Sequence, residues 1–351
     1  MERGDLTARG LVEYYLNKID ATDRNGPSLN AIIELNPDAL DIADALDRER
    51  QESGPRGPLH GIPVVLKANI NTGDKMATTA GPMAHTVRDA ALLLNAMAAA
   101  DPADPASASR PDKLPNYAAD LRSDALIGKR IGILRTYFGA GSDARVEKIL
   151  NESAELLQAN GAEIVDPVEI DINGLGDARY QVLLYEFKTD LNAYLESSNA
   201  SRGSLEEIIE FNTTNAESVM PIFGQDILED SQAKGPLTEP DYVAALEEIQ
   251  RITRNVIDAA LSEHELDALI APSNGPAWMT DHVNGDVAFG IGSSTFAAVS
   301  GYANITVPAG FVSGLPIGMS FIGTAFSEKT LIEIAYAFEQ AGMARRPPPL
   351  E

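Results

Sequence analysis

The most constraining feature of this sequence is a short apolar run that ends in a lysine. Residues 61–67 read G-I-P-V-V-L-K. A continuous apolar run bounded by Gly and Pro is typical of a strand that is buried on both faces. Burying an ammonium group costs several kcal/mol unless the charge is paired or the proton is lost. Lys67 therefore either extends its charged end to solvent along its alkyl stem, or is kept near the interior for a chemical reason.

The residues around this run carry a family resemblance. Residues 57–67 read G-P-L-H-G-I-P-V-V-L-K, and M-A-T-T-A-G follows at 76–81. Both segments resemble the amidase signature family, whose members hydrolyse amides with a serine, a cis-serine and a lysine. The resemblance implies that Lys67 is the base of that triad. A desolvated lysine can accept a proton near neutral pH because burial lowers its pKa. The family usually has Asp after the lysine, and here that residue is Ala68.

The second half of the chain carries the same resemblance in three short segments. They read D-A-L-I-A-P at 267–272, G-Y-A-N-I-T-V-P-A-G at 301–310 and G-L-P-I-G-M-S-F-I-G at 314–323. The resemblance therefore covers nearly the whole chain. It implies an α/β fold, an α/β/α sandwich on a mixed sheet, which acts without a cofactor on a small-molecule or peptide amide.

Two aromatic elements in the middle of the chain are similar to elements of the peptide amidases within that family. Tyr185 lies in L-L-Y-E-F-K, and Phe223 lies in F-G-Q. In peptide amidases this helical region helps to wall the substrate cleft, so the resemblance implies that Tyr185 and Phe223 contact substrate. Aromatic packing in an ordinary core explains the same residues equally well.

The family's central segment is missing from this sequence at about Ala80. In relatives, M-A-T-T-A-G begins one segment soon after the lysine, and T-A-G-P-M-A-x-T-V-x-D-A-A begins another much later. Here both segments share the single T-A-G at 79–81. Between them, relatives carry the nucleophilic serine, the cis-serine and the backbone of the oxyanion hole. A deletion between two short repeats and a wrongly joined gene model both explain the fusion.

The best candidate for a replacement nucleophile is the segment G-I-G-S-S-T at 290–295, which contains Ser293 and Ser294. It precedes an Ala-rich helix that is expected to end near Ser300, and Ser and Thr at a helix start are common caps. No G-x-S-x-G nucleophile elbow is present in the chain. The pattern therefore favours capping over catalysis at Ser293 and Ser294.

The sequence offers little support for a metal site. The chain has no cysteine, and none of its four histidines lies in an H-x-x-x-H or H-E-x-x-H pattern. His60, in the P-L-H-G motif, is expected to pack beneath the lysine strand. The others, His85, His264 and His282, are expected in loops or at helix ends.

The charge of the chain excludes two classes of partner. The formal net charge is −25 and the isoelectric point is about 4.4, so nucleic acid and anionic lipid would be repelled. No apolar run approaches membrane-spanning length, and the first residues do not form a signal peptide. A cytoplasmic location is therefore expected. Because loss of a central block would expose strand edges and apolar faces, a homodimer is one expected outcome.

Turn and capping signals predict the order of the elements. Helices are expected after Thr7, Asn36 and Thr86, and over 142–160, 176–198, 204–211 and a long stretch to Glu263. Strands are expected over 29–35, 61–67, 129–134, 162–168 and 266–273. The chain is expected to form one amidase domain in two parts, 1–80 and 81–351, with an internal boundary near 101–115.

Two functions remain open. One is an amide hydrolase in which a serine attacks the carbonyl with help from Lys67, ammonia leaves, and water releases the acid. The other is a protein with the same fold that lacks the two serines and binds an amide or a partner without hydrolysis, or is an incomplete gene product. The nucleophile distinguishes the two, and this chain is expected to be inactive in hydrolysis.

Overall fold

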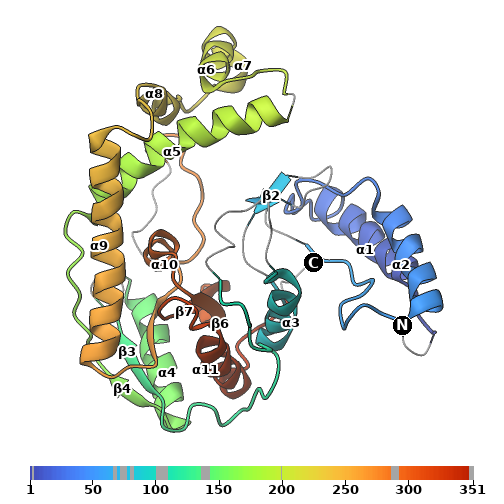
Figure 1. Ribbon diagram of the computed structural model, residues 1–351, viewed down its shortest axis with the longest axis vertical. Coiled ribbons are helices and arrows are strands. Elements are labelled where there is room, and N and C mark those ends of the chain that lie inside the picture. The colour runs from blue at the N-terminus through green and yellow to red at the C-terminus, as the bar shows by residue number, and fades with distance from the viewer. Residues whose placement is uncertain are drawn as a thin grey trace. The chain divides into compact units, whose positions relative to one another are not determined.

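The computed structural model describes residues 1, 4–65, 69–71, 77–79, 83–99, 110–135, 143–198, 200–285 and 292–347 of the 351-residue chain. The chain divides into two compact units (Figure 1). Unit 1 consists of Met1–Arg122 with Arg345–Glu351, and unit 2 consists of Ser123–Ala344. The division of the amidase domain at residue 80 stays a prediction.

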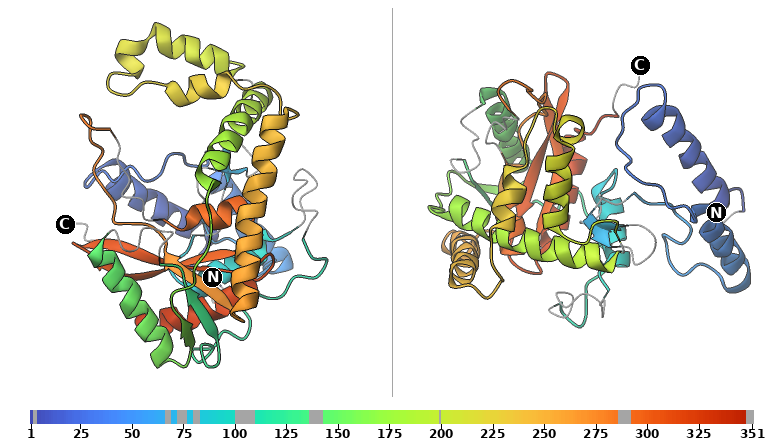
Figure 2. Two further views of the ribbon diagram at one scale, coloured as in Figure 1. Left: turned by 90° about the vertical axis from the view of Figure 1, so that its left-hand side faces the viewer. Right: turned by 90° about the horizontal axis from the view of Figure 1, so that it is seen from above.

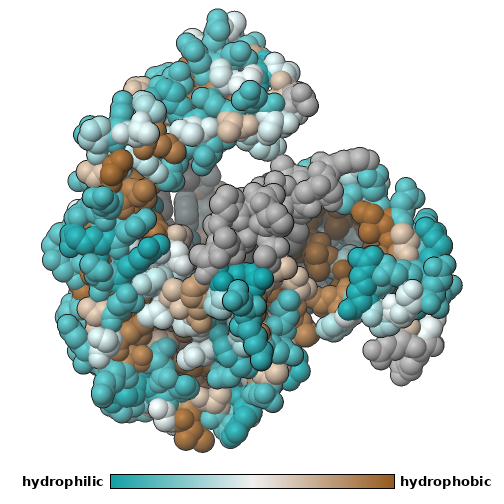
Figure 3. Space-filling model, in the orientation of Figure 1, coloured by the Kyte–Doolittle hydropathy of each residue, from teal (hydrophilic) through white to brown (hydrophobic). Residues whose placement is uncertain are grey.

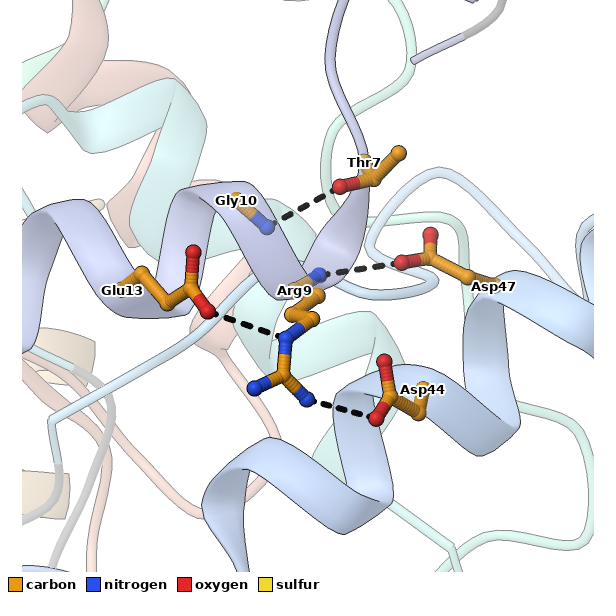
Figure 4. Close-up of polar contacts among 6 residues, drawn as sticks. All are labelled: Thr7, Arg9, Gly10, Glu13, Asp44 and Asp47. Atoms are coloured by element: carbon orange, nitrogen blue, oxygen red, sulfur yellow. Dashed lines mark hydrogen bonds and ion pairs between the residues drawn. The ribbon is translucent and has the colours of Figure 1, made fainter.

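Unit 1 contains a pair of packed helices, α1 (Ala8–Ile19) and α2 (Ala39–Ser53). Both helices were expected from the sequence and are confirmed. The Arg9 guanidinium joins them, because Nε donates to Glu13 Oε1 in α1 at 2.9 Å and Nη1 donates to Asp44 Oδ2 in α2 at 2.6 Å (Figure 4).

The first three backbone N–H groups of α1 all have side-chain acceptors, although a helix start leaves such groups without intrahelical partners. Thr7 Oγ1 accepts from Gly10 N at 3.0 Å, as expected of an N-cap. Asp47 in α2 accepts the other two bonds, from Ala8 N at 2.7 Å and from Arg9 N at 3.0 Å (Figure 4). Its negative charge also stabilises the positive end of the helix dipole. Asp47 therefore couples the start of α1 to α2.

The strand expected over 29–35 is wrong. This segment has no strand partner, and a buried carboxylate holds it instead. Asp23, at 5% exposure in the short π-helix η1 (Asp20–Arg24), accepts from Ala31 N at 2.6 Å and from Ile32 N at 3.2 Å. An Asp side chain has thus taken the place of a neighbouring strand, which hydrophobic periodicity could not reveal.

The buried strand expected over 61–67 is also wrong for the part that the structure describes, 61–65. These residues form no strand, and Ile62, Val64 and Val65 are 40%, 48% and 55% exposed. A strand buried on both faces needs hydrogen-bonded neighbours. Within the described part of unit 1, the strands are β1 (Asn69–Asn71) and β2 (Ala77–Thr79), which pair with each other.

His60 is buried, as expected, but it contacts α2 rather than the underside of a strand. Its Nδ1 accepts from Arg56 N at 3.2 Å, and Nε2 lies 2.8 Å from the Leu46 carbonyl oxygen. These two bonds fit the neutral tautomer with the proton on Nε2. His60 thus holds the loop after α2 against the helix. Further along unit 1, α3 (Val87–Met97) begins at the expected cap, where Thr86 accepts from Asp89 N at 3.1 Å.

Unit 2 is built on a mixed sheet in the order β4-β3-β5-β7-β6. The strands are β3 (Arg130–Ile133), β4 (Glu163–Val165), β5 (Ala268–Pro272), β6 (Asn304–Val312) and β7 (Leu315–Ile322). β4, β3 and β5 are parallel, whereas β7 and β6 are antiparallel to their neighbours. The crossover from β3 through α4 (Ala144–Ala159) to β4 confirms the expected strand-helix-strand unit.

Helices cover both faces of this sheet, so unit 2 is an α/β/α sandwich, as expected (Figures 1 and 2). α4 and α11 (Glu328–Gly342) lie on one face, where Phe338 packs edge-on against Phe321 of β7. On the other face, the core joins Leu269 and Ile322 to residues of α5, α9 and α10, such as Phe296.

The remaining helices follow the sequence prediction closely. They are α5 (Leu175–Ser197), α6 (Leu205–Thr214), α7 (Ala216–Val219), α8 (Asp226–Gln232), α9 (Pro240–Glu263) and α10 (Ser294–Ser300). Ser204 caps α6 by accepting from Glu207 N at 3.2 Å. The return bond of the capping box goes to Gly203 N at 2.8 Å, one residue before the cap.

The visible surface is mostly hydrophilic, with apolar side chains scattered over it (Figure 3). This agrees with the strongly acidic composition. Among the described residues, no helix is both long enough and apolar enough to cross a membrane.

Candidate functional site

The expected base, Lys67, lies outside the described residues, as do Ala68 and the junction at Ala80. The described backbone nearest to them in the chain is the ribbon of β1 and β2. In this ribbon Asn69 pairs with Thr79 in antiparallel register. The segment that follows the lysine therefore runs beside the segment that precedes the junction. The catalytic role of Lys67 stays a prediction.

Tyr185, an expected substrate contact, lies in the core of unit 2 on α5. It is 4% exposed, and its ring centroid lies 5.5 Å from that of Tyr242 on α9. Its hydroxyl donates to Glu239 Oε2 at 2.7 Å. This bond, together with desolvation, raises the pKa of Tyr185 to about 12, so the phenol remains a donor at neutral pH. The described contacts of Tyr185 are core contacts, and its contact with substrate stays a prediction.

A polar network around this tyrosine pair fastens α5 to α8 and α9. Tyr242 OH donates to Glu186 Oε1 at 2.8 Å, and desolvation followed by this bond raises the pKa of Tyr242 to about 12. Lys188 Nζ donates to the carbonyl oxygens of Gln232 at 2.8 Å and Lys234 at 2.6 Å. Each bond joins residues more than 40 positions apart. No local sequence pattern could have found them.

Phe223, the second expected substrate contact, lies in the loop between α7 and α8 and is 46% exposed. Its ring meets the His282 ring nearly edge-on, with 6.0 Å between centroids. Gln225 anchors this loop, because it accepts from Asn212 Nδ2 at 3.0 Å and donates to Thr213 Oγ1 at 3.0 Å. An anchored loop thus presents Phe223 beside the turn at 281–285, which suits contact with a ligand. The contact with His282 was not expected.

Ser293 stands at the N-cap position of α10, as the sequence predicts, but it makes no capping bond. Its side chain is fully buried, and Oγ has no hydrogen-bond partner. Its backbone N donates to the Ser273 carbonyl oxygen at 3.2 Å. The predicted position is therefore confirmed, whereas the predicted side-chain bond is wrong.

A closed ring of three hydroxyl groups lies close to Ser293, on neighbouring strands of the sheet. Ser320 Oγ donates to Ser273 Oγ at 2.9 Å, and Ser273 Oγ donates to Thr306 Oγ1 at 3.2 Å. Thr306 Oγ1 lies 3.2 Å from Ser320 Oγ. In the part of the chain that the structure describes, no serine hydroxyl bonds to a lysine or histidine side chain. These hydroxyls therefore lack the base that an activated nucleophile needs.

Metal ligands are not gathered within the described ranges. No group of three or more His, Asp or Glu side chains there could hold a metal ion. Neither the strands nor the helices of unit 2 bring the histidines into a ligand set. The comparisons with known proteins therefore carry the functional assignment further than local geometry does.

A family model described as Amidase matches the chain in two stretches, residues 10–81 and 75–332. Among curated proteins, a probable amidase of Arabidopsis thaliana is 27% identical, covering 98% of this chain and 88% of its own length. The amidase-like subunit of the glutamyl-tRNA(Gln) amidotransferase of Pseudomonas fluorescens is 29% identical over 74% of this chain. The matched region spans 54% of the length of that amidotransferase polypeptide.

Solved structures give the same result. The peptide amidase of Stenotrophomonas maltophilia has a TM-score of 0.89 at 32% identity, over 99% of this chain and 96% of its own. An amidase family protein of Bacillus anthracis has a TM-score of 0.81 at 25% identity, over 99% of this chain and 90% of its own. The likeness extends over both units.

Proposed function

Because this chain belongs to the amidase family, we propose that it descends from a hydrolase of linear carboxylic amides or C-terminal peptide amides that releases ammonia. We further propose that the chain itself no longer hydrolyses amides, because it lacks the nucleophilic serine and the cis-serine. Its remaining activity is to bind an amide through the retained fold. No cofactor is required by this proposal.

The single observation that carries the proposal is the way the family model matches. The two matched stretches overlap at residues 75–81. That overlap contains the T-A-G at 79–81 that two distant family segments share. The alignment with the Arabidopsis relative supports the same conclusion, since it runs over 482 positions but contains 98% of only 351 residues. Long gaps must therefore fall in this chain.

The chemistry explains why such a loss would stop hydrolysis. In the complete reaction, a serine oxygen bonds to the amide carbonyl carbon while its proton passes through the second serine toward the lysine. Ammonia then leaves with a proton, and water cleaves the resulting ester to the acid. Lys67 alone supplies a base without a nucleophile. Loss of one member of such a triad costs on the order of a millionfold in kcat, so loss of both serines would leave no useful rate.

Two side chains are proposed to serve the amide-binding site. Phe223 would contact the ligand directly, since its exposed ring stands on a loop that Gln225 anchors. Tyr185 would act by its position in α5, since its hydroxyl is already engaged with Glu239. On this basis, Phe223→Ala would weaken binding more than Tyr185→Phe would.

Two alternatives to amide binding stand beside this proposal. In one, the chain is a scaffold that binds a partner; in the other, it is an incomplete gene product with no function of its own. A homodimer is a further proposal, supported by β6, which pairs on one side only within the described sheet. Light scattering of the purified chain at several concentrations would measure its oligomeric state. A monomer throughout would exclude the dimer.

An active-site label tests the loss of the nucleophile. The full chain, confirmed by intact mass, would be treated with a fluorophosphonate, which reacts with activated serines. A complete peptide amidase would serve as the positive control. We expect no gain in mass for this chain. A single adduct mapped to one serine would overturn the proposal and identify the substitute nucleophile.

A further inference from the structure

A cavity of about 780 Å³ lies in unit 1. Its walls come from the end of α2, from the loop at 55–62 and from residues before α1. Leu6, Pro55, Pro58 and Ile62 make much of this wall apolar. The volume falls in the range of roughly 300 to 1,000 Å³ that is usual for small-molecule sites.

Arg50 supplies the positive charge at this cavity. Its Nη2 donates to the His60 carbonyl oxygen at 2.7 Å, whereas its Nε is buried and has no hydrogen-bond partner. No carboxylate among the described residues pairs with this guanidinium. Nearby Arg56 offers a contrast, because Glu49 holds it in an ion pair. Arg50 is thus a partly buried cation whose charge the described residues leave uncompensated.

An uncompensated guanidinium in an apolar wall is informative, because buried charges in proteins are normally paired. His60 cannot supply an anion, since both of its ring nitrogens are engaged and the pattern fits the neutral form. A guanidinium matches the geometry of a carboxylate closely and can hold it with two parallel hydrogen bonds. The missing partner is therefore best supplied by a ligand.

We propose that this cavity binds a small carboxylic acid with an apolar body, whose carboxylate pairs with Arg50 and whose body lies against Leu6, Pro58 and Ile62. The cavity belongs to unit 1, whereas the residues proposed to bind an amide belong to unit 2. The chain as a whole carries a net charge of −25, which repels anions at long range. Affinity for a carboxylate must therefore come from this local pair and from the apolar contacts.

Isothermal titration of the full chain with hexanoate tests the proposal, with 1-hexanol as the uncharged probe of the same chain length. Hexanoate should bind the parent protein more tightly than 1-hexanol does. Arg50→Gln should weaken hexanoate by roughly tenfold or more, in line with the strength of a charged hydrogen bond. Arg50→Lys should retain part of the affinity. Arg48→Gln removes a charge from the same helix outside the cavity wall and should leave the affinity unchanged.

A second variant keeps the test independent of the fold around Arg50. A side-chain carbon built on Gly57, which lines the cavity, meets no atom within 4 Å, and its backbone is not left-handed. Gly57→Phe should therefore fold normally, fill the cavity and abolish hexanoate binding. The proposal is overturned if hexanoate does not bind the parent, if Arg50→Gln binds it equally well, or if Gly57→Phe leaves binding intact.

Discussion

Asp47 joins the two helices of unit 1, and replacing it offers a sharp test of how unit 1 is held together. In Asp47→Ala, the backbone N–H groups of Ala8 and Arg9 lose bonds of 2.7 Å and 3.0 Å. Loss of a helix cap typically costs about 0.5 to 2 kcal/mol, and a bond to a charged group about 1.5 to 3 kcal/mol. Because both bonds are only partly buried, water would replace some of this loss. We expect a cost of about 2 kcal/mol.

The neighbouring carboxylate Asp44 provides a matched control. It pairs with Arg9 at 2.6 Å, but both side chains are well exposed, at 37% and 40%. Exposed ion pairs contribute from about zero to 1 kcal/mol. Asp44→Asn should therefore cost less than about 1 kcal/mol, although it lies on the same helix and contacts the same partner residue.

Urea denaturation of the parent and both variants, followed by circular dichroism, would measure these costs. If unit 1 unfolds as a separate step, its own transition should shift, while that of unit 2 should not. Equal costs for Asp47→Ala and Asp44→Asn would refute the reasoning, because they would mean that capping from α2 contributes no more than a surface ion pair.

Three further results are expected in unit 2. Gly132→Ala should destabilise it by about 1 to 3 kcal/mol, since a Cβ there would lie 2.6 Å from Leu266 Cδ1, and denaturant midpoints would measure the change. Gly176→Ala, near the start of α5, meets no atom within 4 Å and should stabilise the protein by up to about 1 kcal/mol in the same assay. The pKa values of Tyr185 and Tyr242, raised to about 12, imply a contribution to stability that is complete below the usual value of about 10 and is lost as the pH rises to about 12. Urea midpoints should fall over this interval, and less steeply in Tyr242→Phe; no fall would contradict the assignment.

Local rules predicted the helices well. The caps at Thr7, Thr86 and Ser204 were each predicted from a hydroxyl residue before an apolar stripe, and each accepts the expected backbone bond. These features depend on residues three positions apart, so the sequence contains everything that determines them. The parallel crossover through α4 followed from the same kind of local pattern.

Features that depend on distant partners could not be predicted in this way. Residues 29–35 have strand-like composition, but Asp23 captures their backbone. Residues 62–65 are apolar enough for a buried strand, yet the described part of unit 1 offers them no strand neighbour. The bond from Tyr185 to Glu239 spans 54 positions. The proposed site at Arg50 likewise arises from an unpaired charge, which only the folded chain reveals.

The central claim is that this chain has the amidase fold without amide hydrolysis. The most direct test is an assay of ammonia release from a simple peptide amide, using folded protein whose intact mass matches the 351-residue sequence. A complete peptide amidase would establish the detection limit, and Lys67→Ala would be measured beside the parent. We expect no ammonia above the buffer rate from either protein. Release by the parent that disappears in Lys67→Ala would contradict the claim, because it would show that the chain has assembled a working triad.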